Sequence, residues 1–343
     1  MAEITVRGAG IFGLSIAWIC AQRGAKVRVI DPAGVGAGSS GGIVGALAPH
    51  VPENWNAKKA FQLESLLMAE GFWSAVQAAS GLSPGYIRSG RLQPIADTAA
   101  LELAHARHAT ARTLWRDTAK WEVVAKPGEA WGPQSPTGWV IHDTLSALVH
   151  PHRACAALAG ALKNAGVDIA RDAPDQGQIV WATGIAGLDQ LSVGRSRAVG
   201  TGIKGQAALL KYEAAGAPQI FANGIHIIPH LNGTVAVGST SERHFVSGTD
   251  TDMALDAVVN TARLVLPALK DAPVITTWAS VRPRARSRAP MLGAWPGRPG
   301  HFIANGGFKI GFGMAPKVAE TMADLLLKGA CTVPNGFEVA ASF

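Results

Sequence analysis

Residues 4–31 read ITVRGAGIFGLSIAWICAQRGAKVRVID, and this stretch decides the fold. A short apolar run at 4–6 is followed at once by the glycine-rich segment 8–13 and then by a helical pattern that ends at a glycine. A second apolar run, 27–30, closes on Asp31. The order of strand, glycine turn, helix, strand and acid is typical of a Rossmann unit that binds a dinucleotide. The unit alone leaves both FAD and NAD open.

Each part of this segment has a physical role. Gly8 permits a turn too tight for a Cβ atom, Gly10 lets the backbone approach a pyrophosphate, and Gly13 allows the helix to pack on the strand. The positive end of the helix faces the phosphates. Asp31 follows at the distance where a carboxylate accepts hydrogen bonds from ribose hydroxyls. We therefore predict a cofactor site that includes these four residues and Phe12 in the same turn.

The composition suits a large protein with two domains. Its length of 343 residues is about that of two domains. Hydrophobic residues make up 48% of the chain, enough for a sizeable core. The net charge of +7 is compatible with nucleic acid, an acidic surface or small anionic ligands. The basic residues are scattered except at 282–288, which argues against nucleic acid without excluding a tRNA partner.

Cysteine spacing and hydropathy indicate the expected compartment. Cys20, Cys155 and Cys331 lie far apart and form no metal-binding pattern, so we expect no disulfide framework, no metal site and a cytoplasmic location. The apolar stretch 11–20 could be taken for a signal peptide, but the Rossmann helix explains it better. No apolar run of about 18 residues is present, so we expect no membrane span. The sequence does not indicate an oligomeric state.

Beyond the first unit the chain alternates between two kinds of pattern. The glycine- and serine-rich segment 34–45 is either a linker or a second loop around phosphate, in which Ser39 and Ser40 would be donors. Residues 179–184 read as a buried strand that ends in a turn. Between 202 and 278 alternating runs dominate, and Asn232-Gly233 joins two of them as a hairpin.

The C-terminal section returns to the first pattern, with a strand at 301–304, a glycine-rich loop at 305–313 and a helix at 314–328. We predict a Rossmann-type α/β domain, of the kind found in two-dinucleotide-fold flavoproteins, and a second α+β substrate domain on an antiparallel or mixed sheet. The predicted cofactor domain is discontinuous and comprises 1–60, 141–199 and 278–343. The substrate domain comprises 61–140 and 200–277.

These pieces, in this order, resemble the D-amino-acid-oxidase-like flavoproteins, and within that family most of all the glycine oxidases. The more specific signals are Ser39-Ser40 with the run 45–49, the motif 278–283 (Trp-Ala-Ser-Val-Arg-Pro), and Pro290-Met291-Leu292-Gly293 before the last glycine loop. The resemblance covers essentially the whole chain and implies FAD, held non-covalently, as the cofactor.

The resemblance also implies site residues. Arg282 matches the family arginine that pairs with a substrate carboxylate. His226 stands where glycine oxidases place a carboxylate-binding tyrosine, and Lys309 where they have an arginine, so these departures affect the choice of substrate. The further residues expected beside the cofactor are Ser39, Ser40, Val44, Gly45, Ala46, Ala182, Gly184, Gly307, Phe308, Lys309, Ile310 and Gly311.

The implied activity is oxidation of a small amine or amino acid by hydride transfer to the flavin, after which the electrons would pass to oxygen, giving peroxide, or to another acceptor. An arginine suits a carboxylate because it donates two parallel N–H groups. Arg282 is otherwise a structural arginine, and Arg284, Arg286 and Arg288 are either a basic surface loop or an entrance that attracts anions. Two other functions stay open. One is a tRNA-modifying flavoenzyme that oxidises a carboxymethylaminomethyl group on a wobble uridine, and the other is a flavin-binding protein without turnover.

Overall fold

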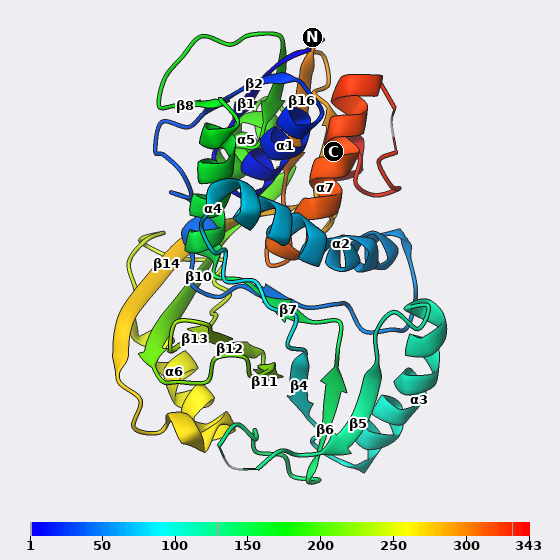
Figure 1. Ribbon diagram of the computed structural model, residues 1–343, viewed down its shortest axis with the longest axis vertical. Coiled ribbons are helices and arrows are strands. Elements are labelled where there is room, and N and C mark those ends of the chain that lie inside the picture. Colours follow the sequence, from blue (N-terminus) through cyan, green and yellow to red (C-terminus); the bar gives the residue numbers. More distant parts are fainter. Residues whose placement is uncertain (1, 129, 331) are drawn as a thin grey trace.

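The computed structural model describes residues 2–128, 130–330 and 332–343. Cys331, one of the three cysteines considered above, lies outside the described residues. Figure 1 shows two lobes, each built around one large sheet, with long strands running from one lobe to the other. Of the helices that the structure describes, none has the length and apolar character needed to cross a membrane.

The first lobe contains a six-stranded sheet. Its strands are parallel except for the first, β15, which pairs antiparallel with β16 at one edge. The spatial order is β15 (Met291–Ala294), β16 (His301–Asn305), β9 (Gln178–Trp181), β1 (Glu3–Arg7), β2 (Lys26–Ile30) and β8 (Asp168–Ala170). This parallel sheet confirms the Rossmann-type fold, and it contains β9 from the middle of the chain and β16 from its C-terminal section.

The second lobe contains an eight-stranded mixed sheet, which confirms the second part of the predicted fold class. Its Asn232-Gly233 hairpin is formed as predicted, with β12 antiparallel to β13. The spatial order is β14 (Val274–Ala285), β10 (Gly200–Lys211), β13 (Thr234–Gly238), β12 (Ile225–His230), β11 (Gln219–Ala222), β4 (Arg91–Pro94), β6 (Trp139–Asp143) and β5 (Trp121–Ala125). A small sheet of β3 (Ala46–Leu47) and β7 (Ala147–Leu148) lies between the lobes.

The helices begin and end at residues with clear local causes. Asn56 accepts a hydrogen bond from the N–H of Lys59 at the start of α2, and Asp252 accepts one from Ala254 at the start of α6. Gly81 and Gly329 end α2 and α7 with positive φ angles. The helices are α1 (Ile11–Gln22), α2 (Ala57–Ser80), α3 (Thr98–Leu114), α4 (Pro151–Asn164), α5 (Gly184–Ser192), α6 (Met253–Val265) and α7 (Gly311–Lys328), with short 3-10 turns at η1 (Ser39–Gly41), η2 (Pro267–Leu269) and η3 (Val339–Ser342).

Packing assigns α1, α2, α4 and α7 to one layer. Helix α1 is buried on nearly all sides and contacts both α7 and α4, while α2 also packs on these two helices. The predicted division placed most of α2 in the substrate domain, whereas α2 packs on α7 and α4, and its buried Phe61 and Trp73 share a hydrophobic cluster with residues of α1 and α7 that also extends to α3 and β5. We propose a two-domain division centred on the two sheets, with α2 in the cofactor domain.

Candidate functional site

A cavity of about 870 Å³ lies between the two lobes. One side is formed by the loops that follow β1, β2, β9 and β16, where the carboxyl ends of parallel strands meet. The other side is formed by β10, β12 and β14 of the mixed sheet. The volume is at the upper end of the range for small-molecule and cofactor sites. The carboxyl edge of such a sheet is also where α/β proteins bind nucleotides.

The glycine turn is packed as the sequence predicts. Gly8 has a φ of +109°, and a Cβ atom there would collide with the carbonyl of Ala182 on the neighbouring strand. A Cβ on Gly13 would collide with the carbonyl of Gly8. Gly13 therefore allows the turn and the helix to approach each other without lining the cavity. These contacts leave the N-terminal turn of α1 facing the cavity, where backbone N–H groups suit an anion.

Two polar side chains hold this turn in place. The Asp31 carboxylate accepts hydrogen bonds from the N–H groups of Ala9 at 2.8 Å and Ala33 at 3.0 Å. The Ser40 hydroxyl oxygen accepts one from the N–H of Ile11 at 3.0 Å, so it caps α1 from a distant loop. Both residues also line the cavity. The segment around Ser40 is therefore part of the site, which excludes the interpretation of 34–45 as a linker.

The loop after β16 also lines the cavity. The side-chain amide of Asn305 donates to the carbonyl of Gly184 at 2.8 Å, and its oxygen accepts from the N–H of Gly306 at 2.7 Å. Phe308 has a φ of +45°, a backbone conformation that is uncommon for a residue with a side chain. Its N–H donates to the carbonyl of Pro283 at 3.0 Å, which joins the loop to β14.

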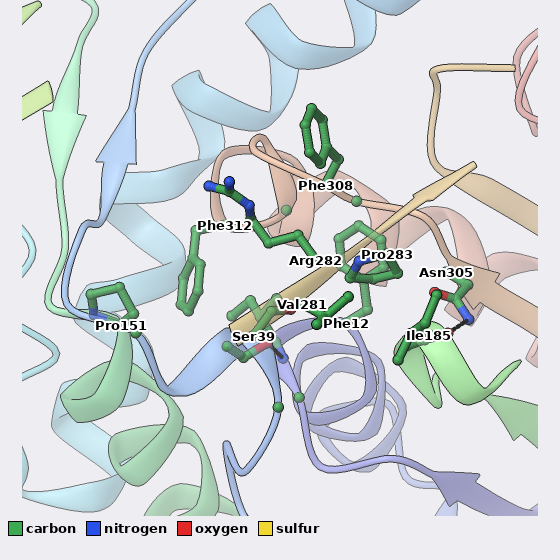
Figure 2. A pocket seen from close by; sticks show the side chains of 18 of the residues that line it. Phe12, Ser39, Pro151, Ile185, Val281, Arg282, Pro283, Asn305, Phe308 and Phe312 are labelled. Atoms are coloured by element: carbon green, nitrogen blue, oxygen red, sulfur yellow. Dashed lines mark hydrogen bonds between the residues drawn. The ribbon is translucent and has the colours of Figure 1, made fainter. Parts of the chain in front are cut away.

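Arg282 lies on β14 and projects toward the loop that carries Phe308 (Figure 2). Its Nη1 donates to the Ser239 hydroxyl at 2.7 Å, and its Nη2 donates to the carbonyls of Thr240 at 2.6 Å and Lys204 at 3.3 Å. A Cβ on Gly205 would collide with the guanidinium, so this glycine makes room for it. Burial lowers the pKa of Arg282 to about 10, which leaves it charged at neutral pH.

These contacts restrict what Arg282 can bind. A guanidinium has five N–H groups, and three are already used. Both edges that offer a carboxylate two parallel N–H groups include Nη2, whose two protons are donated to carbonyl oxygens. Within the described part of the chain, Nε is buried and has no partner. The geometry favours a single contact through Nε or Nη1 rather than the two parallel contacts expected from the sequence.

His226 and Lys309 line the same cavity. The His226 ring packs against Phe221, with ring centroids 4.7 Å apart. Burial, reinforced by the positive charges of Arg91 and Lys309, lowers the pKa of His226 to about 3, so the ring is neutral at physiological pH. Loss of hydration and the charge of Arg282 also lower the pKa of Lys309.

The cavity brings together nearly all of the predicted site residues. Gly13 lies behind the turn and Ile310 lines a neighbouring cavity instead. The predicted residues that line the cavity are Gly8, Gly10, Phe12, Asp31, Ser39, Ser40, Val44, Gly45, Ala46, Ala182, Gly184, His226, Arg282, Gly307, Phe308, Lys309 and Gly311.

Several residues that line the cavity were not predicted from the sequence. Trp278 lines the cavity and packs its ring against Gly42, and Ile185, on α5, also lines it. Asn305 and Phe312 were overlooked as well, although both lie in or next to the C-terminal glycine loop. The position of Trp278 in the recognised 278–283 motif was a usable signal. Ile185 had none, because α5 was not predicted.

The comparisons with known proteins agree with this geometry. Residues 3–325 match the model of the family described as FAD dependent oxidoreductase, abbreviated DAO. The chain belongs to this family. It is therefore an FAD-dependent oxidoreductase, and the resemblance inferred from its motifs is confirmed.

Individual relatives point in the same direction. A glycine oxidase of Pseudomonas aeruginosa is 33% identical over 125 residues, which are 36% of this chain and 34% of that enzyme, so the match spans about a third of its length. A putative thiamine biosynthesis oxidoreductase, ThiO, of Rhizobium etli is 28% identical over 95% of this chain and 96% of its own. The glycine oxidase structure of Geobacillus kaustophilus has a TM-score of 0.83 at 18% identity, over 99% of both chains. The iminodiacetate oxidase structure of Chelativorans sp. BNC1 has a TM-score of 0.84 at 19% identity, over 96% and 97%.

The residues present fit FAD. Gly10 and Gly45 let the segments that line the cavity pack closely, because a Cβ on Gly10 would come within 3.1 Å of the Ser40 hydroxyl and one on Gly45 would collide with the carbonyl of Val149. The N-terminal turn of α1 and the Ser39 loop line the cavity, and Gly307 of the loop after β16 packs against Phe12 of that turn. The lining of the cavity therefore combines anion-binding backbone at the start of α1 with two cations, Arg282 and Lys309.

Proposed function

We propose that this protein oxidises a small amine or amino acid in the manner of a glycine oxidase, with non-covalently held FAD and oxygen as the final acceptor. The observation that carries the proposal is the continuity of one cavity from the α1 glycine turn to Arg282, His226 and Lys309, in a chain of this family. Glycine oxidases and ThiO among its relatives support the choice of an amine substrate.

The cofactor supplies a two-electron acceptor for a hydride from the carbon next to the amine. The imine released from the substrate hydrolyses in water to a carbonyl compound and ammonia or an amine, and oxygen receives the two electrons to give hydrogen peroxide. The protein's part is to bind, orient and exclude water. Arg282 and Lys309 would attract the substrate carboxylate, and Val44, Gly45 and Ala46 would lie near the flavin ring.

His226 does not act as a base in this proposal, although it faces the substrate end of the cavity. A ring with a pKa of about 3 is a weak proton acceptor. It would instead contact the substrate as a neutral imidazole, held in place by Phe221. We therefore expect the amine to lose its proton to solvent before it is oxidised.

An anaerobic mixing experiment tests the proposal. Purified protein is expected to be yellow and to release FAD on denaturation. Glycine, N-methylglycine and a panel of amino acids are mixed with it without oxygen, and bleaching of the oxidised flavin is followed. Bleaching by at least one small amine, with peroxide formed when oxygen is admitted, is the expected result. FAD-loaded protein that no amine reduces would contradict the proposal and favour a binding protein without turnover.

A further inference from the structure

A second cavity, of about 500 Å³, lies beside the loop that follows β16. Positively charged side chains converge on it from separate parts of the chain. Lys58 comes from α2, Arg284 from β14, Arg288 from the turn after β14, Arg243 from the loop after β13, and Lys309 from the loop before α7.

These charges have no counter-ion among the described residues. The lining contains no aspartate or glutamate, and none of the five basic side chains forms an ion pair with a carboxylate in the described part of the chain. Lys204, in the same lobe, contrasts with them because its ammonium pairs with Asp252 at 3.2 Å. The Lys58 ammonium has instead the carbonyl of Arg288 at 3.4 Å. Clustered like charges repel one another, and a bound anion would offset that repulsion.

The second cavity adjoins the proposed substrate end of the first. Arg282 and Arg284 stand two residues apart on β14, so their side chains leave the same face of the strand. Each guanidinium carbon lies 5.5 Å from the Phe308 ring centroid, so the two are at most twice that distance apart. Residues 306–309, Lys309 among them, line both cavities.

We propose that the second cavity binds a second anionic group of the substrate, a carboxylate or a phosphonate or phosphate carried on the amine. This rests on the proposed function. In this arrangement Arg282 and Lys309 hold the first carboxylate, and Arg284, Arg288 and Lys58 hold the second acid across Phe308. The preferred substrate is an amino diacid rather than glycine itself.

Matched substrates test the proposal with the FAD-loaded enzyme. N-methylglycine, N-(carboxymethyl)glycine and N-(phosphonomethyl)glycine share the reacting amine and differ in the second acid. Anaerobic flavin reduction is expected to show a kcat/KM at least about tenfold higher for one of the diacids than for N-methylglycine, a difference of about 1.4 kcal/mol. The more effective diacid identifies whether the site favours a carboxylate or a phosphonate.

Variants of the arginines test whether the preference for a diacid depends on the second cavity. Arg284→Gln and Arg288→Gln are expected each to lower the ratio of diacid to N-methylglycine efficiency by about tenfold. Arg288 is exposed, so its variant keeps the test valid if Arg284→Gln folds poorly. Arg286→Gln is the matched control, because this exposed arginine of the same cluster lines neither cavity, and its ratio is expected to stay unchanged.

Binding without turnover separates this proposal from the proposed function. Oxydiacetate and methoxyacetate carry no amine, and calorimetry is expected to show tighter binding of oxydiacetate that weakens in Arg288→Gln. If N-methylglycine bleaches the flavin and the kcat/KM values for the diacids are about equal to its own, the proposed second anion site is refuted while the proposed amine oxidation stands. Binding of tRNA that depends on Arg288, with no effect on the ratio, would overturn it in favour of a nucleic-acid surface.

Discussion

Replacement of Arg282 by methionine tests the proposed substrate contact most directly. The change removes all five guanidinium N–H groups and keeps an apolar stem of similar length. Of these groups, the structure leaves only those on Nε and Nη1 for a ligand, because Nη2 donates to two carbonyls. We therefore work from one charge-assisted hydrogen bond, which contributes about 1.5–3 kcal/mol. That energy corresponds to a loss of about 10- to 150-fold in kcat/KM.

The measurement is anaerobic flavin reduction by the best carboxylate-bearing amine, together with FAD content and urea unfolding. FAD content is expected to stay at the wild-type level, since Arg282 is assigned to the substrate. The free energy of unfolding is expected to fall by about 1–3 kcal/mol, because the carbonyls of Thr240 and Lys204 lose their donor. The exposed Arg286→Gln serves as the control for both measurements.

The two effects can be told apart. If Arg282→Met keeps wild-type reduction kinetics while its unfolding free energy falls, Arg282 is a structural residue and the substrate contact is refuted. Gly205→Ala gives an independent test, because its Cβ displaces the guanidinium without removing the charge. A rise in KM with little change in kcat would indicate that the position of this charge serves binding.

Three further predictions follow from the site. Gly8→Ala forces a side chain into a φ of +109° and against the Ala182 carbonyl, so purified protein is expected to retain at least tenfold less FAD, measured by the ratio of flavin to protein absorbance. His226→Gln is expected to leave the pH profile of flavin reduction unshifted, because the wild-type ring stays neutral above pH 4. Burial lowers the pKa of His150 and His226 to about 3, so below pH 6.5 the unfolded chain binds more protons than the folded protein. The free energy of unfolding, measured with urea, is therefore expected to fall as the pH drops below 6.5, by about 1.4 kcal/mol per pH unit for each of the two histidines.

The cofactor half of the site could be predicted because its signals are local. Gly8, Gly13 and Asp31 lie within one βαβ unit, and the contacts that each needs are made by neighbours within that unit or by the adjacent parallel strand. The same holds for the Asn232-Gly233 hairpin, whose turn residues alone indicate the pairing of β12 with β13. Local chemistry determined these elements, and the structure has them where they were predicted.

The substrate half depended on contacts between distant segments. Helix α2 was predicted correctly as a helix, but periodicity does not say which sheet a helix covers, and it packs on α4 and α7. Arg282 was recognised by its motif, whereas the partners that occupy its Nη2 lie on β10 and on the loop after β13. No spacing along the chain indicates that Lys58 and Arg284 line one cavity. Such convergence follows only from the tertiary fold.

In the proposed reaction, the distribution of charge in the main cavity would make a dedicated acid or base unnecessary. At the α1 end, the Asp31 carboxylate is engaged by backbone N–H groups and helps to hold the turn. Arg282 and Lys309 are cations that line the same cavity, and His226 is kept neutral by burial and by the charges of Arg91 and Lys309. A positive, partly dehydrated site favours an anionic ligand and disfavours a protonated amine beside it, because like charges repel. The same electrostatics that bind the carboxylate would therefore select the neutral amine, the form from which a hydride can leave.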